Sequence, residues 1–184
     1  MQKKQPQRTL TPVLVGSFLA QSAAQALAQT APKAATAATV RANEAVARQL
    51  SLDDKKDFDE ATRGLVATLP DPIVKDPQGK VVWDAKRYAF IKGDAPATVN
   101  PSLWRQEKLN NAAGLFKVTD GIYQIRGYDL ANMTLVEGKT GWIVIDTMLT
   151  AEIAKATLAF AMEKLGSTKP VVAVIYTHSH ADHY

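Results

Sequence analysis

The chain has no cysteine, and its 184 residues include only three histidines. The absence of cysteine excludes disulfide scaffolds, thiol catalysis and zinc sites built on thiolates. A metal site in this chain must therefore use histidines and carboxylates as ligands. The apolar run Pro12–Ala20 is shorter than the about 20 residues that a membrane-spanning helix needs, and no longer run follows it. The sequence accordingly predicts no stable membrane span.

Acidic residues are missing from the start of the chain, where none precedes Glu44, while Lys3, Lys4 and Arg8 lie close to the N-terminus. The formal net charge of +4 depends on these three cations, and without them it falls to +1. A nearly neutral protein lacks the positive field that binds phosphates, so the sequence predicts no nucleic-acid partner. Hydrophobic residues make up 46% and charged residues 22%, as in ordinary globular proteins.

Residues 1–28 have the pattern of a secretory signal peptide. A basic start and a short apolar run precede the small-x-small sequence Ala26-Leu27-Ala28. This pattern predicts a periplasmic or secreted protein; an uncleaved N-terminal anchor and a disordered tail are the alternatives. Residues 29–39 are small and monotonous, which is typical of a flexible linker.

Residues 40–113 are predicted to form a helical N-terminal region. A helix capped by Ser51 is expected to continue to Leu69, because apolar residues recur at helical spacing until Pro70-Asp71-Pro72. Two short strands joined by a turn are expected within residues 73–83. Asn100-Pro101 begins another helix, since asparagine is a good N-cap and proline suits the first helical position.

The character of the sequence changes at residues 114–184. Strand-like runs separated by glycine-containing turns are followed by an amphipathic helix and by one continuous β-branched run. This order predicts an α/β layered fold. The last run is typical of a strand that is covered on both faces. The elements are Ile122–Arg126, Met133–Glu137 and Trp142–Asp146 as strands, Thr150–Leu165 as the helix, and Val171–Tyr176 as the final strand.

All three histidines follow that final strand, within a single short motif. His178 and His180 are two residues apart, so in extended backbone they point to the same side and can share one ion. A turn of the chain into a helix would carry Asp182 and His183 to a neighbouring position, where a second ion would lie about 3.5–4 Å from the first. Ligands commonly gather where strands end in α/β sheets. The alternative is an exposed histidine-rich turn with adventitious metal affinity.

Thr177–His183 (THSHADH) resembles the metal-binding signature of the metallo-β-lactamase superfamily. The similarity is wider than this motif and covers roughly residues 69–184. The segments that resemble the zinc-dependent alkylsulfatases of that superfamily are Asn100–Gln106 (NPSLWRQ), Gly121–Glu137 (GIYQIRGYDLANMTLVE), Gly141–Asp146 (GWIVID) and Val171–His183 (VVAVIYTHSHADH).

The resemblance implies a site with two Zn²⁺ ions, the first held by His178 and His180 and the second by Asp182 and His183. It implies that a metal-activated hydroxide hydrolyses alkyl sulfate esters to an alcohol and sulfate, as in a sulfuric ester hydrolase. Asp182 is the candidate catalytic residue, since it could orient this hydroxide or accept its proton. Asp146 is expected to support the ligand loop; a simple turn or helix-cap role is the alternative.

The implied fold is a four-layer αββα sandwich, of which residues 114–184 would form the first half, truncated, after the helical N-terminal region. The family supplies further zinc ligands and its dimerisation region from downstream segments, so we expect this chain to be a fragment that is inactive alone and a homodimer only as a full-length form. Two alternatives stay open. One is another hydrolase of the superfamily, such as a lactamase, thioesterase or lactonase; the other is a non-catalytic metal-binding polypeptide.

Overall fold

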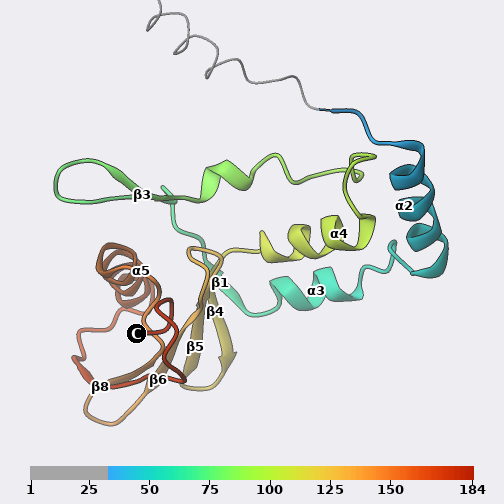
Figure 1. Ribbon diagram of the computed structural model, residues 1–184. Helices are drawn as coiled ribbons and strands as arrows, with labels where there is room; N and C mark the ends of the chain where they lie inside the picture. Colours follow the sequence, from blue (N-terminus) through green and yellow to red (C-terminus); the bar gives the residue numbers. More distant parts are fainter. Residues whose placement is uncertain (1–32) are drawn as a thin grey trace, which may run out of the picture. The chain divides into compact units, whose positions relative to one another are not determined.

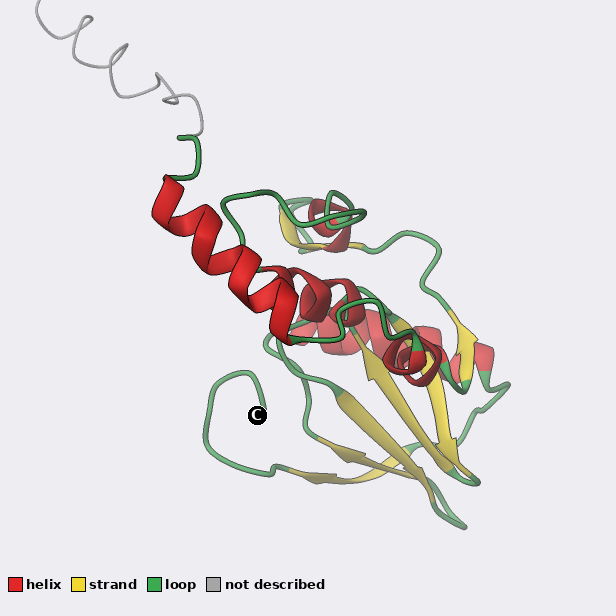
Figure 2. Cartoon of the chain, turned by 90° about the vertical axis from the view of Figure 1, so that its right-hand side faces the viewer, coloured by secondary structure: helices red, strands yellow, loops and turns green. Residues whose placement is uncertain are grey.

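The computed structural model describes residues 33–184, and residues 35–184 form one compact unit. The predicted signal peptide lies outside the described residues. The elements are α2 (Ala37–Gln49), α3 (Lys56–Thr62), β1 (Leu65–Ala67), β2 (Ile73–Lys75), β3 (Val81–Asp84), the 3₁₀ helix η1 (Ala85–Tyr88), α4 (Pro101–Asn110), β4 (Gly114–Thr119), β5 (Ile122–Arg126), β6 (Met133–Glu137), β7 (Trp142–Ile145), α5 (Ala151–Lys164) and β8 (Val171–Ile175) (Figures 1 and 2).

Helices α2 and α4 of the N-terminal region begin at side-chain caps. Thr36 caps α2, so this helix starts before the predicted residue 40, and Asn100 caps α4 by accepting a hydrogen bond from the Ser102 N–H at 2.9 Å. Helix α3 is joined to α4 by Arg105, whose guanidinium lies 2.9 Å from the Asp57 carboxylate and over the Phe58 ring. This largely buried cation therefore links two helices of the predicted helical region.

The helix predicted to run from Ser51 to Leu69 is wrong at both ends. Helix α3 begins at Lys56 without a side-chain cap, so Ser51 does not cap it. Helix α3 ends at Thr62, and Leu65–Ala67 forms β1, an edge strand that pairs with β4. Gly64 has a φ of 76°, a conformation that favours glycine, and its carbonyl oxygen accepts a hydrogen bond from the Lys117 N–H at 2.7 Å. Pairing with the sheet therefore prevails over the helical spacing of the apolar residues.

The main sheet has six strands in the order β1-β4-β5-β6-β7-β8. Every neighbouring pair is antiparallel except β7 and β8, which are parallel. Because α5 lies between these two strands in the chain, it forms the crossover that a parallel pair requires. The carboxyl ends of β7 and β8 consequently lie at the same edge of the sheet.

Helix α5 covers one face of this sheet (Figure 1), and the hydrophobic core lies between them. Full burial of one such side chain contributes about 1.5–3 kcal/mol to the stability. The small β2–β3 hairpin packs against the same helix and adds Val74 to the core. The sheet contributes Leu115, Ile125, Met133, Leu135, Trp142 and Val144, and the helix contributes Ile153, Phe160 and Ala161.

Strand β8 differs from the other strands of the sheet because all of its residues are exposed. Val172, Val174 and Ile175 are 54%, 44% and 49% exposed. Alternate residues of a strand face opposite sides of the sheet, so both faces of β8 are open among the described residues. The sequence predicted a strand covered on both faces, and the described part of the chain does not provide that cover. Within the same residues, no helix is long and apolar enough to cross a membrane.

A substitution at Gly127 tests the close packing beneath the β5–β6 connection. Gly127 has a φ of 78°, and an added Cβ would lie 2.6 Å from the Ala113 Cβ. Gly127→Ala should therefore cost more than the about 1–2 kcal/mol of a left-handed alanine alone. Gly79→Ala is the matched control, because its φ is 82° and nothing lies within 4 Å of the added atom. Equal losses in urea unfolding for the two variants would contradict this packing.

Candidate metal centre

The four predicted ligands lie on the segment that follows β8. His178 and His180 are exposed, whereas the side chains of Asp182 and His183 are 30% and 23% exposed. The segment closes in a turn in which the His183 N–H donates to the His180 carbonyl at 3.0 Å. The chain therefore turns at Asp182 and His183 as predicted, but by a tight turn in place of the expected helix.

The structure brings the three imidazole rings together. The His178 Nε2 and His180 Nδ1 atoms are 3.0 Å apart, which agrees with the prediction that these two side chains point to the same side. The centroids of the His178 and His183 rings are 4.1 Å apart. The fourth predicted ligand also joins this group, since the Asp182 Oδ2 lies 3.4 Å from the His183 Nε2.

Asp146, directly after β7, anchors this group. Its carboxylate accepts hydrogen bonds from the Thr177 N–H at 2.9 Å, from the Thr177 hydroxyl at 2.8 Å and from the His183 Nδ1 at 2.8 Å. The residue is only 7% exposed. Burial raises the pKa of this carboxyl, but the hydrogen bonds from Thr177 and His183 outweigh it and hold the pKa below the ordinary value for aspartate. Asp146 is therefore a carboxylate that only accepts hydrogen bonds.

An ionised Asp146 determines which ring nitrogens carry protons. His183 must donate from Nδ1, so its neutral ring has its lone pair on Nε2. The Thr177 hydroxyl gives its single proton to Asp146, so it accepts one from the His178 Nδ1, 2.9 Å away. His178 then accepts at Nε2 from the His180 Nδ1. In their neutral forms, the three histidines of this hydrogen-bond chain would carry the proton on Nδ1 and a lone pair on Nε2, the form that binds a metal through Nε2.

The chemistry of these side chains fits a transition-metal ion such as zinc, because imidazole nitrogen and carboxylate oxygen are its usual ligands in the absence of thiolates. Their arrangement is not that of a formed site. Among the described residues, no group of three or more histidines and carboxylates is placed to hold one ion. The His178 lone pair is directed to the His180 ring, so ion binding requires these two rings to separate.

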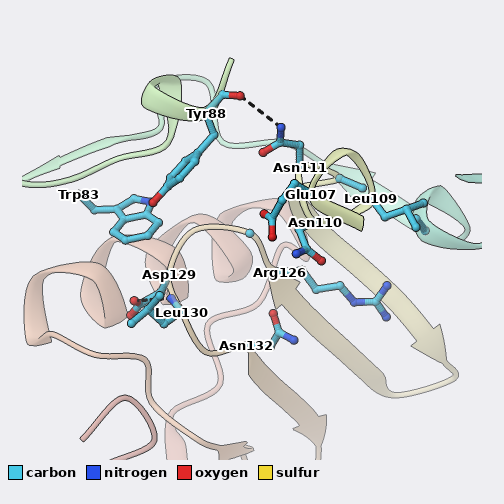
Figure 3. Close-up of a pocket in the computed structure, with 13 residues that line it drawn as sticks. Trp83, Tyr88, Glu107, Leu109, Asn110, Asn111, Arg126, Asp129, Leu130 and Asn132 are labelled. Carbon is cyan, nitrogen blue, oxygen red and sulfur yellow. Dashed lines mark hydrogen bonds between the residues drawn. The ribbon is translucent and has the colours of Figure 1, made fainter. Parts of the chain in front are cut away.

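A hollow separate from the histidine loop lies between the N-terminal region and the sheet. Figure 3 shows Trp83 and Tyr88 on one side and Asp129 and Leu130 of the β5–β6 connection on another, around a cavity of about 490 Å³. None of the predicted metal ligands lines it. Sequence reasoning missed both this cavity and the burial of Asp129. Asp129 lies in the segment Gly121–Glu137 that resembles the alkylsulfatases, but no spacing of ligand-type residues marks it.

Comparison with known proteins finds one family model that matches part of the chain and several similar proteins that are all named sulfatases. A model described as the metallo-beta-lactamase superfamily matches residues 126–184. The chain is 53% identical over 162 residues to the linear primary-alkylsulfatase of a Pseudomonas species. It is 50% identical over 147 residues to the alkyl/aryl-sulfatase BDS1 of Saccharomyces cerevisiae. It is also 46% identical over 180 residues to an (R)-specific secondary-alkylsulfatase of a Pseudomonas species.

These three alignments cover 87%, 79% and 96% of this chain but 24%, 23% and 26% of the relatives. The chain thus spans about a quarter of the length of the curated relatives that it matches. A solved structure of the stereoselective inverting sec-alkylsulfatase Pisa1 from a Pseudomonas species matches with 48% identity and a TM-score of 0.76, over 83% of this chain and 24% of that one. The predicted α/β class is confirmed by the mixed sheet and by this likeness.

Removal of the Thr177 hydroxyl tests the proton arrangement of the histidine loop. In Thr177→Val, the His178 Nδ1–H loses its acceptor, so His178 should return to a mixture of tautomers while His183 keeps its Nδ1–H form. Long-range ¹H–¹⁵N spectra of the metal-free chain would show this. They are recorded about two pH units above the ordinary pKa of histidine, where the rings are neutral. Thr134→Val, which removes a hydroxyl bonded to Gln124 on the sheet, is the control. An unchanged His178 tautomer in Thr177→Val would contradict the inferred arrangement.

Proposed function

We propose, from the confirmed resemblance to the alkylsulfatases of the metallo-β-lactamase superfamily, that this chain takes part in the zinc-dependent hydrolysis of alkyl sulfate esters. The observation that carries the proposal is identity of 46–53% to three named alkylsulfatases over 79–96% of the chain. In the proposed reaction, water and an alkyl sulfate give an alcohol and hydrogen sulfate. The substrate is a small molecule with an apolar chain and one anionic group.

His178, His180, Asp182 and His183 are the residues that would hold the metal. Zinc bound by such ligands lowers the pKa of a bound water to about 7 and so supplies hydroxide at neutral pH. The family resemblance supports two zinc ions in the complete site. The periplasmic or secreted location, which depends on residues 1–28, stays a prediction.

The chain's own residues have distinct roles in this proposal. Asp146 fixes His183 through Nδ1 and Thr177 through its N–H and hydroxyl, so the His183 Nε2 is left to the metal. Asp182 is half-exposed beside His183, where its Oδ2 could orient the attacking water or accept its proton. The candidate catalytic role of Asp182 thus rests on its place at the rim of the histidine group.

The exposure of the ligand loop suggests that these residues provide one side of the site. His178 and His180 lie on the surface, and β8 behind them is exposed along its whole length. Catalysis by a metal centre needs ligands held in place and a site from which bulk water is excluded. We therefore propose that the 184-residue chain alone, supplied with zinc, turns over no alkyl sulfate above the reagent blank.

A chimera tests the proposed function. The aligned part of the Pseudomonas linear primary-alkylsulfatase is replaced by this chain, which is 53% identical to it over 162 residues. The chimera should hydrolyse dodecyl sulfate in the presence of zinc. His178→Ala in the chimera should reduce the rate by more than the about 10–100-fold that is typical of losing a residue that only supports a ligand. Sulfate release and zinc content are measured on the same samples.

Ser179→Ala is the matched control for the chimera, since Ser179 lies between two of the predicted ligands and is exposed. It should leave the rate unchanged. A folded, zinc-loaded chimera without sulfatase activity would refute the proposed function. Turnover by the 184-residue chain alone would refute the proposal that it provides only one side of the site.

A further inference from the structure

A buried carboxylate on the β5–β6 connection holds a distant loop of the chain. Asp129 is 9% exposed, and its Oδ1 accepts a hydrogen bond from the neighbouring Leu130 N–H at 2.6 Å. Its Oδ2 accepts from the Leu149 N–H, which is 20 residues further along the chain. Bonds from N–H groups to a carboxylate are among the stronger hydrogen bonds in proteins. Asp129 therefore joins the β5–β6 connection to the loop between β7 and α5.

That loop has an unusual backbone. Asp146 has a φ of 57° and Met148 a φ of 68°, although neither is glycine. Side chains rarely adopt this left-handed region, so surrounding contacts must hold it. Met148 is held by burial, with 1% of its surface exposed, and Asp146 by its N–H, which donates to the Ile175 carbonyl at 2.9 Å. The bond from Leu149 to Asp129 holds the far end of the same loop.

The Asp146 carboxylate, at this left-handed position, lies against the loop after β8. There the carboxylate accepts hydrogen bonds from the Thr177 N–H, from the Thr177 hydroxyl and from the Nδ1–H of His183. A change in the backbone between Asp146 and Leu149 would therefore displace an acceptor on which the His183 orientation depends. The contacts form one continuous path from Asp129 to the histidine loop.

We propose that Asp129 is a positioning residue for the candidate metal centre, acting through Leu149 and Asp146 on Thr177 and His183. The proposal rests on the proposed function for the role of the metal, but the path itself is present in the metal-free chain. If Asp129 only stabilised the β5–β6 connection, its hydrogen bond from the Leu130 N–H would be enough. The second oxygen, which reaches Leu149, points to the longer-range role.

Hydrogen exchange of the Thr177 amide measures the path directly, because this N–H is bonded to Asp146 and belongs to an otherwise exposed residue. In Asp129→Ala, the ratio of the Thr177 exchange rate to that of Leu135, in the buried core, should rise about tenfold. Asp129→Asn retains one acceptor oxygen, so it should give a smaller rise. Zinc affinity, measured by competition with a chromophoric chelator, should fall about tenfold in Asp129→Ala.

Asp76→Ala is the matched control, because the Asp76 carboxylate also accepts two backbone hydrogen bonds in a turn, from Gln78 and Lys80. It should leave the Thr177 ratio and the zinc affinity unchanged. An unchanged Thr177 ratio in both Asp129 variants would overturn the positioning role, and so would an equal rise in Asp76→Ala. If Asp129→Ala fails to fold, the ratio in Asp129→Asn decides. Absence of zinc binding by the unsubstituted chain would count against the proposed function and not against the exchange result.

Discussion

The candidate metal centre depends on one buried carboxylate, that of Asp146. A charged group with 7% exposure loses most of its hydration, which is unfavourable unless protein donors replace the water. Thr177 and His183 provide those donors, and together they lower the pKa of the carboxyl in spite of burial. The hydrogen bonds that replace the lost hydration of Asp146 thus hold the loop after β8 close to the end of β7.

The topology of the sheet makes this contact possible. Strands β7 and β8 are the neighbouring pair that runs parallel in the described sheet, so their carboxyl ends lie next to each other and bring Asp146 to Thr177. Helix α5 is the crossover between them, and it buries apolar side chains of β7 but none of β8. The positive φ values at Asp146 and Met148 occur where the chain leaves β7 to enter that crossover. Backbone strain is therefore located at the connection from which the site is built.

Local patterns predicted the elements that local chemistry determines. Asn100 caps α4 because its side chain serves the adjacent backbone, and β8 forms because its β-branched residues favour strands. The cluster His178, His180 and His183 was visible because its members are close in sequence. Leu65–Ala67 could not be assigned in this way, since its apolar residues also fit a helix and only pairing with β4 decides. Asp129 was missed for a related reason: its partner Leu149 is distant in sequence.

The distribution of burial suggests how metal binding and local order are related. Strands β5, β6 and β7 each contribute buried side chains to the core, whereas β8 and His178 to His180 are exposed. The free energy of local unfolding is lowest where few apolar contacts are lost. The exposed strand β8 and the ligand loop after it should therefore unfold locally more easily than the buried strands. An ion that binds only the ordered loop stabilises that order by mass action. Asp146 and its donors therefore reduce the cost of ordering the loop, and they do so from the end of β7, a strand with buried side chains in the core.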